Sequence, residues 1–353
     1  MILITGAAGF IGKYFVEKFS EKEMVLATDR KKIMFKNENI VFVRGELENK
    51  TFLEELFKKY NIEIVIHLAA EKNLAICEQS SEVVDRNIMF SYHLIELSKK
   101  INAHFIFLSS DQVFDGRRGN YMEKVLPNPI NNYGKYKAKI EKVAMSYKKA
   151  SICRTALVFG FTNDLKVYNQ DEVENQSEFV MHVVARLLSG KEIKLPKDEI
   201  ISPTVVDLLF EQIYLIIKRH LYGIFHCCGN ETISRYEFGR KIAKYFNLDD
   251  TKIIPIEGKR YRPKNVSLNS DNSEKLLGMK GVGIDEMLGM IMVSREDKLL
   301  SVQISYMNCE YVWIIGKGVY DRNMQEVGEN REEEIKSFVQ SQGLNVKEWR
   351  IKK

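Results

Sequence analysis

Two hydroxyl groups and one amine are spaced along the chain in a way that suits proton transfer. Tyr133 and Lys137 lie four residues apart in NNYGKYKAKIE, so on a helix they share one face. An ammonium beside a phenol favours the phenolate and lowers the pKa of the tyrosine toward the range useful for catalysis. Ser110 ends the apolar run AHFIFLSS, where its hydroxyl can bind the same substrate oxygen. This tyrosine–lysine spacing also arises by chance in lysine-rich helices, but with the serine we expect a catalytic set.

A glycine-rich turn near the start of the chain predicts a nucleotide site. In LITGAAGFIG, Gly6, Gly9 and Gly12 follow an apolar strand and precede a helix. One glycine permits the turn, another lets backbone N–H groups approach a pyrophosphate, and the last allows close packing of helix on strand. A plain strand-to-helix turn needs only one glycine. We therefore expect a dinucleotide at this turn.

The end of the second strand carries signals for both nicotinamide dinucleotides. Asp29 ends MVLATD, where a carboxylate can accept hydrogen bonds from the adenosine ribose. Arg30, Lys31 and Lys32 follow directly and could instead bind a 2′-phosphate. The sequence leaves the choice between NAD and NADP open.

A parallel sheet is needed to bring these residues together. Short β-branched runs alternate with expected helices at Phe10–Ser20, Lys50–Tyr60, Ser81–Ile101 and Tyr133–Lys149. Continuous apolar strands separated by helices indicate a sheet covered on both faces. Such sheets bind ligands at the carboxyl ends of their strands. The predicted fold is α/β, a doubly wound parallel sheet of the Rossmann type.

The pattern changes along the chain and predicts three parts. A dinucleotide-binding domain is expected over residues 1–160, with its sheet completed by about 203–228. Residues 161–202 and 229–284 are expected to form a smaller, interleaved substrate-binding part, and 285–353 a C-terminal α+β appendage of unassigned role. In the substrate-binding part a capping box is expected in SRYEFGRKIAKYFNL. In the appendage, LLSVQISYMN and EYVWIIGKGVYD read as two strands, REEEIKSFVQSQG as a helix and LNVKEWRIKK as a last strand.

Composition excludes several classes of protein. The 353 residues are 45% hydrophobic and 29% charged, which is ordinary for a globular domain. The net charge of +5 is spread among both signs without a basic, aromatic-rich block, so we expect no nucleic-acid partner. Neither a membrane-spanning run nor a signal peptide is found, and we expect a cytoplasmic protein. The cysteines show no CxxC and the histidines no HExxH, so we expect no metal site.

The glycine pattern, Ser110 and Tyr133-x-x-x-Lys137 together resemble the extended short-chain dehydrogenases/reductases over about residues 1–285. The resemblance implies catalytic roles for Ser110, Tyr133 and Lys137, with Asn87 orienting the lysine through water. It also implies a homodimer that joins through the helices at Ser81–Ile101 and Tyr133–Lys149. The cofactor-binding residues expected from the motifs and the resemblance are Gly6, Gly9, Phe10, Ile11, Gly12, Asp29, Arg30, Glu46, Leu47, Leu68, Ala69, Ala70, Asn87, Tyr133 and Lys137.

Finer stretches resemble the dTDP-4-dehydrorhamnose reductase group, among them SSDQVFDG, RTALVFG, SPTVVDLL and YRPKNVSLN. That resemblance implies reduction of a 4-keto-6-deoxy sugar nucleotide by NADPH or NADH, with hydride added at C4 and Tyr133 as the proton donor. The substrate-binding regions expected are 162–176, Ser202–Thr204 and Tyr261–Pro263. The individual contacts expected are Asp111, Thr204 and Arg262, of which Arg262 could pair with a diphosphate or form a surface salt bridge.

Other functions remain open on the same fold. An epimerase needs no further carboxylate, whereas a 4,6-dehydratase would need an Asp–Glu pair where this chain has Asp111 and Gln112. An amide cannot act as a general acid or base, which argues against dehydration. The stretches AAEK and GNETISRYEF also resemble the regulatory β subunit of methionine adenosyltransferase, a non-enzymatic relative that binds NADP. Lys72 and Ala75 replace the usual threonine and aspartate of the reductases, which affects the expected sugar contacts.

Overall fold

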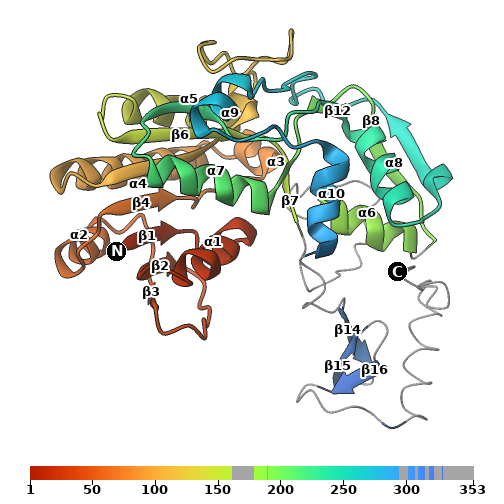
Figure 1. The fold of residues 1–353 in the computed structure, drawn as a ribbon, viewed down its shortest axis with the longest axis horizontal. Helices are drawn as coiled ribbons and strands as arrows, with labels where there is room; N and C mark the ends of the chain where they lie inside the picture. The colour runs from red at the N-terminus through yellow and green to blue at the C-terminus, as the bar shows by residue number, and fades with distance from the viewer. Residues whose placement is uncertain are drawn as a thin grey trace. The chain divides into compact units, whose positions relative to one another are not determined.

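The fold is drawn in Figure 1 from a computed structural model, which describes residues 1–160, 179–188, 190–293, 301–306, 309–314, 318–321 and 328. The chain divides into two compact units. The first comprises Met1–Val158, Glu199–Thr232 and Lys259–Ile284, and the second comprises Phe159–Asp198, Ile233–Gly258 and Asp285–Lys353.

One segment belongs to a different unit from the one expected. Residues 259–284, expected in the substrate-binding part, fold with the first unit. Leu277 is buried in the core of that unit. The Ser273 hydroxyl donates to the Glu123 carboxylate and accepts the backbone N–H of His226. These buried contacts hold the segment against the sheet.

A seven-stranded sheet forms the centre of the first unit, in the order β11-β6-β5-β4-β1-β2-β3. Every pair of neighbouring strands in it is parallel. This confirms the predicted doubly wound α/β fold. The strands are β1 (Ile2–Thr5), β2 (Val25–Asp29), β3 (Ile40–Arg44), β4 (Ile64–His67), β5 (His104–Ser110), β6 (Ala150–Thr155) and β11 (Gly223–His226).

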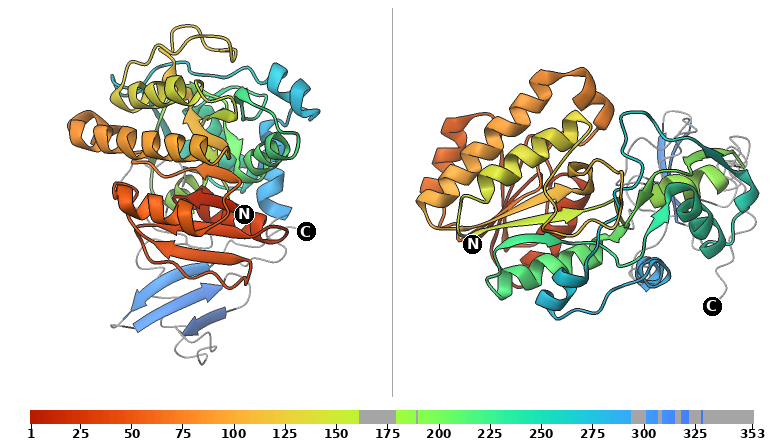
Figure 2. Two further views of the ribbon diagram at one scale, coloured as in Figure 1. Left: turned by 90° about the vertical axis from the view of Figure 1, so that its left-hand side faces the viewer. Right: turned by 90° about the horizontal axis from the view of Figure 1, so that it is seen from above.

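Helices cover both faces of this sheet (Figure 2). One hydrophobic cluster joins Ile2 and Ile4 of β1 to helices α1, α7 and α9, and another joins Leu3 to α2, α4 and α5. The alternation of Ile2, Leu3 and Ile4 between clusters is the two-residue period of a strand buried on both sides. The helices of this unit are α1 (Phe10–Ser20), α2 (Lys50–Lys59), α3 (Leu74–Gln79), α4 (Ser81–Lys100), the 3-10 turn η1 (Asp111–Val113), α5 (Asn132–Ala144), α7 (Val206–Lys218) and α9 (Asp271–Leu277).

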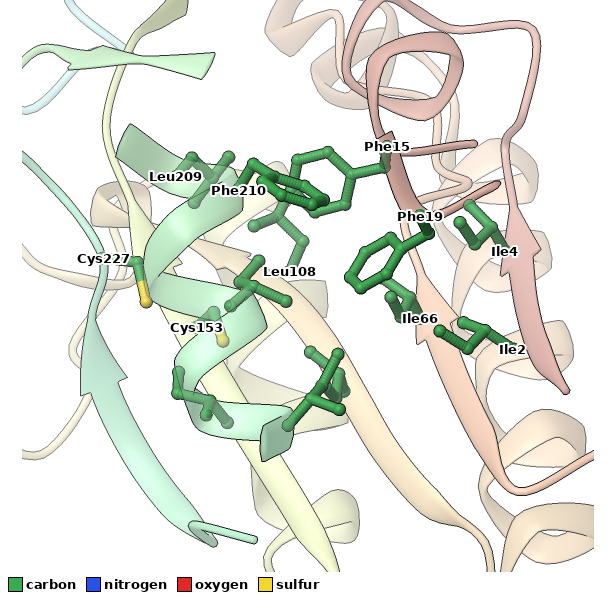
Figure 3. Close-up of a cluster of buried hydrophobic side chains, with 14 of the residues drawn as sticks. Ile2, Ile4, Phe15, Phe19, Ile66, Leu108, Cys153, Leu209, Phe210 and Cys227 are labelled. Atoms are coloured by element: carbon green, nitrogen blue, oxygen red, sulfur yellow. The ribbon is translucent and has the colours of Figure 1, made fainter. Parts of the chain in front are cut away.

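Aromatic packing fixes α1 beside α7. Phe210 of α7 lies with its ring centroid 5.5 Å from that of Phe15 and 4.9 Å from that of Phe19, both in edge-to-face contact. Figure 3 shows these rings together with Ile4 and Ile66 of the sheet. Since α1 follows the glycine-rich turn directly, this packing also sets the direction in which the turn is presented.

Side-chain caps set where the helices of the first unit begin. The Asn131 side chain accepts the N–H of Gly134 at the start of α5, and Ser80 accepts that of Val83 at the start of α4. Helix α5 ends at Ala144 instead of the expected Lys149, because the chain must turn before β6 begins at Ala150.

The second unit contains a short parallel pair of strands and several helices. Strand β8 (Ile193–Pro196) pairs with β13 (Ile253–Ile256), and the predicted capping box of Ser234 and Glu237 is confirmed at the start of α8 (Arg235–Tyr245). The remaining elements here are α6 (Phe179–Leu188), η3 (Asp250–Lys252) and α10 (Ile284–Val293), and the chain also has the short strands β7 (Val158–Phe159), β9 (Ile200–Ile201), β10 (Thr204–Val205) and β12 (Ile233–Ser234).

The C-terminal appendage contains an antiparallel meander of β14 (Ser301–Tyr306), β15 (Cys309–Ile314) and β16 (Gly318–Asp321). Three strands stand where two were expected, because EYVWIIGKGVYD supplies both β15 and β16. The helix expected in REEEIKSFVQSQG, the strand expected in LNVKEWRIKK and the loop 162–176 lie outside the described residues. Among the helices that are described, none is both long and apolar enough to cross a membrane.

Candidate functional site

The predicted site residues of the first unit follow the carboxyl ends of neighbouring parallel strands. Strand β1 leads into Gly6, β2 ends at Asp29, β4 leads into Leu68 and β5 ends at Ser110. Because these strands are adjacent and parallel, their ends meet at one edge of the sheet. The structure thus gathers residues from four separate parts of the chain.

The glycine turn is as tight as its backbone allows. Gly6 has a φ of +73°, and a Cβ placed on it would lie 2.8 Å from the backbone nitrogen of Ala69. A Cβ on Gly12 would collide with the Gly6 carbonyl oxygen. Gly9 is the N-cap of α1 and supplies no side-chain cap, so the first N–H groups of this helix remain for a ligand. This geometry suits an anionic phosphate group.

Asp29 is held against this turn. Its carboxylate accepts the backbone N–H of Ala8 at 3.0 Å and that of Lys31 at 2.9 Å. The carbonyl of Asp29 accepts the N–H of Gly45, which places the chain before Glu46 and Leu47 beside the end of β2. The carboxylate therefore lies next to the glycine turn, where a ribose would be expected.

Ser110, Tyr133 and Lys137 are brought together by the packing of α5 on the end of β5. Gly134 permits this packing, because a Cβ there would collide with the carbonyl oxygen of Gln112. The Ser110 hydroxyl lies near enough to the Tyr133 phenol to lower its pKa. The Lys137 ammonium donates to the Leu108 carbonyl at 2.7 Å, and its Nζ lies 5.8 Å from the centre of the Tyr133 ring.

The electrostatics of Tyr133 differ from expectation. Burial raises the pKa of the phenol above its usual value, the negative charge of Asp111 raises it further, and the nearby Ser110 hydroxyl opposes both. The expected lowering by Lys137 is wrong for this structure. Burial lowers the pKa of Lys137 to about 7, and its ammonium is directed at a carbonyl. The phenol therefore holds its proton at neutral pH.

Asp111 and Gln112 form a fixed group beside Ser110. The Ser110 hydroxyl donates to Asp111 at 2.8 Å, and the Gln112 amide nitrogen donates to the same carboxylate oxygen at 3.2 Å. The other end of the Gln112 amide accepts from Asn131 at 3.1 Å. Both ends of this amide are thus used to position Asp111, which is itself only 2% exposed.

The Asn87 side chain is hydrogen-bonded to the backbone of Glu71 in this structure. Its side chain accepts the N–H of Glu71 at 3.1 Å and donates to the Glu71 carbonyl at 3.4 Å. The Tyr136 hydroxyl donates to the same carbonyl at 3.1 Å. Together they fix Glu71, which directly follows the Leu68–Ala70 segment expected to contact a cofactor.

Of the two remaining substrate candidates, the structure brings one near the site. The Tyr261 carbonyl, next to Arg262, accepts from Asn131 at 3.2 Å at the start of α5. Thr204 is fully buried, and its hydroxyl donates to the Ser202 carbonyl at 3.4 Å and accepts from Thr155 at 3.2 Å. Thr204 is therefore not presented to a ligand.

A buried ion pair joins helix α5 to strand β6. Arg154 of β6 and Glu141 of α5 are at most 3% exposed and approach to 2.7 Å. Ser109, the neighbour of Ser110, also donates to Glu141. The pair ties the ends of β5 and β6 to the helix that carries Tyr133 and Lys137.

Sequence reasoning missed a buried polar chain below the site, formed by Thr5, His67 and Ser91. His67 bonds to the hydroxyls of Thr5 and Ser91, at 2.8 Å in each case. A signal for it was present, because Thr5 and His67 are polar residues at the carboxyl ends of apolar strands.

Within the described part of the chain, no group of acidic residues, histidines and cysteines could hold a metal ion. The thiols of Cys77, Cys153, Cys227 and Cys228 are free and buried.

A glycine turn between β1 and α1 and a serine–tyrosine–lysine set at one edge of a doubly wound sheet define a protein of the extended short-chain dehydrogenase/reductase class. Within that class, residues 1–291 match the family described as RmlD substrate binding domain, and the chain belongs to this family.

Known proteins similar to this chain include both enzymes and a subunit of an enzyme. Methionine adenosyltransferase 2 subunit beta of Xenopus laevis is 27% identical over 313 residues, covering 83% of this chain and 88% of that protein. Its counterpart from Rattus norvegicus is 28% identical over 311 residues, covering 83% and 89%. The solved structure of a hypothetical dTDP-4-dehydrorhamnose reductase from Sulfolobus tokodaii is 28% identical, with a TM-score of 0.69, covering 81% of this chain and 98% of that one.

Proposed function

We propose that this protein is an NAD(P)H-dependent reductase of a 4-keto-6-deoxy sugar nucleotide, similar to dTDP-4-dehydrorhamnose reductase. The observation that carries the proposal is the grouping of Ser110, Tyr133 and Lys137 beside the glycine turn. The family match over residues 1–291 supports it.

The residues at the sheet edge fit a nicotinamide dinucleotide. The turn at Gly6 and Gly12 leaves room for phosphate where side chains would intrude, and Asp29 offers a carboxylate to a ribose. Solved structures of the same fold contain such cofactors, including a dTDP-4-dehydrorhamnose reductase from Bacillus anthracis in complex with NADP. A bound dinucleotide would supply the hydride.

The chain's own residues would manage the proton. Tyr133, protonated at neutral pH, would donate to the ketone oxygen as negative charge develops on it. The Ser110 hydroxyl, whose proton is directed at Asp111 in this structure, would turn toward the same oxygen and polarise the carbonyl. Lys137, one helical turn from Tyr133, would bind the ribose and stabilise the phenolate left after proton transfer.

The residues beside Ser110 argue against dehydration. Dehydration would need an acid or base at Gln112, whose amide is held between Asp111 and Asn131.

The test is a direct assay of cofactor oxidation. Purified protein is mixed with NADH or NADPH and dTDP-4-keto-6-deoxy sugar, and the absorbance of the reduced nicotinamide is followed. We expect a loss of absorbance that depends on protein and sugar, and the two rates will identify the preferred cofactor. Cofactor binding without turnover of any 4-keto sugar nucleotide would contradict the reductase.

A non-catalytic regulatory subunit is the second candidate. It is supported by the similarity to methionine adenosyltransferase 2 subunit beta, which extends over 83% of the chain. Such a subunit would bind the dinucleotide and form a stable complex with a methionine adenosyltransferase from the same cell. Co-purification of that enzyme with inactive, cofactor-binding protein would favour this second function.

A further inference from the structure

A chain of buried hydrogen bonds runs beneath the candidate cofactor site and is centred on His67. The residue is 1% exposed and ends β4, and its ring lies among those of Phe90, Phe105 and Phe107. Its two nitrogens are bound on opposite sides, by Thr5 at the end of β1 and by Ser91 of α4. None of these three residues belongs to the serine–tyrosine–lysine set.

The hydrogen-bond partners fix the direction of every bond in this chain. The Ser91 hydroxyl donates its one proton to the Asn87 carbonyl at 2.6 Å, so it must accept from Nε2 of His67. Nδ1 is then the unprotonated acceptor of the neutral ring and receives the Thr5 hydroxyl proton. Burial lowers the pKa of His67 to about 3, which keeps this neutral form at physiological pH.

One end of this row of hydrogen bonds reaches the segment expected to contact the cofactor, and the other end reaches Glu71, directly after that segment. With its proton directed at His67, the Thr5 hydroxyl accepts the N–H groups of Leu68 and Ala69, each at 3.3 Å. Thr5 also directly precedes Gly6, where the phosphate-binding turn begins. At the other end, Asn87 holds Glu71 through both of its backbone groups.

We propose that His67 is a positioning residue for the dinucleotide: as a neutral Nε2–H imidazole it joins the glycine turn, the segment after β4 and α4 into one rigid cradle. This inference rests on the proposed cofactor site but not on the identity of the sugar. The ring touches no cofactor and acts by orienting Thr5 and Ser91. Because a buried hydroxyl or N–H left without its partner destabilises the local arrangement, loss of His67 will loosen the cradle.

The first test replaces His67 with phenylalanine, which keeps an aromatic ring and removes both hydrogen bonds. The matched control is His104→Phe. His104 is also buried. Its Nε2 donates to the Ser151 hydroxyl at 2.7 Å, because that hydroxyl donates its own proton to the Leu221 carbonyl. His104 starts β5 and so lies at the end of the strand away from Ser110. Binding of NADH and NADPH is measured by calorimetry, and the melting temperature is measured alongside.

We expect His67→Phe to weaken binding of the preferred dinucleotide about tenfold, which corresponds to about 1.4 kcal/mol. We expect His104→Phe to lower the melting temperature by about as much as His67→Phe does, and to leave the affinity for the dinucleotide unchanged. Equal affinity in wild type and folded His67→Phe would overturn the inference, as would an equal loss in both variants. Wild-type protein that binds neither dinucleotide would contradict the proposed function, and the inference with it; binding without turnover would leave the inference standing.

A second pair of variants decides the matter if His67→Phe does not fold. Ser91→Ala removes the hydroxyl that accepts from His67, and Ser98→Ala is its control on the same helix. Ser98 is equally buried and donates to the carbonyl four residues before it, at 2.7 Å, as Ser91 does at 2.6 Å. We expect only Ser91→Ala to weaken dinucleotide binding, by about threefold. Identical affinities in the two variants would overturn the inference.

Discussion

At the scale of single residues, burial affects the pKa values of the site more than the charge of Lys137 does. The spacing of Tyr133 and Lys137 predicted that the two lie on one helix, which α5 confirms. It could not show where the ammonium points. That direction depends on the Leu108 carbonyl at the end of a distant strand. Likewise, the influence of Asp111 on the phenol depends on its burial, which the sequence does not report.

The lowered pKa of Lys137 predicts how stability depends on pH. Between about 7 in the folded chain and the usual 10.5 when unfolded, the unfolded chain binds a proton that the folded chain does not. The free energy of unfolding must therefore rise with pH across this window and fall as pH returns toward 7. Urea denaturation at pH 7 and pH 9 should show a rise about 1–2 kcal/mol larger in wild type than in Lys137→Met. The exposed Lys139→Met serves as the control, and an unchanged rise in Lys137→Met would contradict the argument.

Asp29 predicts a preference between the two cofactors. Its carboxylate beside the turn would accept ribose hydroxyls of NADH and repel the 2′-phosphate of NADPH. Asp29→Asn should weaken NADH binding about tenfold, since it removes a charge-assisted hydrogen bond, and should improve NADPH binding relative to NADH. Calorimetry with both cofactors measures this ratio, with the exposed Asp85→Asn as a control for net charge. A ratio that stays at the wild-type value would show that Arg30 and its neighbours govern the choice.

At the scale of elements, the sequence predicted the parts whose signals are local. The glycine pattern predicted the strand–turn–helix at residues 2–20, and the capping box predicted the start of α8. The polar chain through His67 could not be predicted in the same way. Its partners Thr5 and Ser91 are 62 and 24 residues away. The register of β1 beside β4 brings Thr5 to His67, and the packing of α4 on the sheet brings Ser91 there.

The packing of the turn gives a prediction for Gly12. A Cβ at this position would meet the Gly6 carbonyl, so Gly12→Ala must displace α1 from the turn. We expect loss of dinucleotide binding and a decrease of about 1–3 kcal/mol in the free energy of unfolding. Calorimetry and urea denaturation measure the two effects. Gly289→Ala is the control, because a Cβ placed there would lie 4.0 Å from the nearest atom outside its own helix backbone. A Gly12→Ala protein that binds the dinucleotide as wild type does would contradict the role given to the turn.

At the scale of the whole molecule, every residue proposed for the cofactor and the catalytic set lies in the first unit. The continuous apolar strands predicted the sheet, but they could not show that residues 259–284 fold with it, since that depends on contacts such as Ser273 with Glu123. The family match likewise ends at residue 291, before the meander of β14 to β16. The homodimer through α4 and α5 and the cytoplasmic location stay predictions.

This division predicts the effect of shortening the chain. A protein that ends at Val293 keeps α10 and all the proposed cofactor residues, the last of which is Lys137. We expect its affinity for the dinucleotide to equal that of the full chain, because the removed residues contribute none of these contacts. Calorimetry on both proteins measures this, with melting curves to establish that the short form is folded. A folded short form with weakened binding would assign the appendage a part in the cofactor site.

The measurement that tests the account most directly is the turnover of Tyr133→Phe with the 4-keto sugar nucleotide and the preferred cofactor. Tyr147→Phe is the matched control, because its hydroxyl donates to the Ala103 carbonyl away from the site. We predict that Tyr133→Phe lowers kcat by about 10²–10⁴-fold, because the proton donor is lost. Tyr147→Phe should turn over as wild type does. A Tyr133→Phe protein as active as wild type would contradict the central claim that this phenol donates the proton.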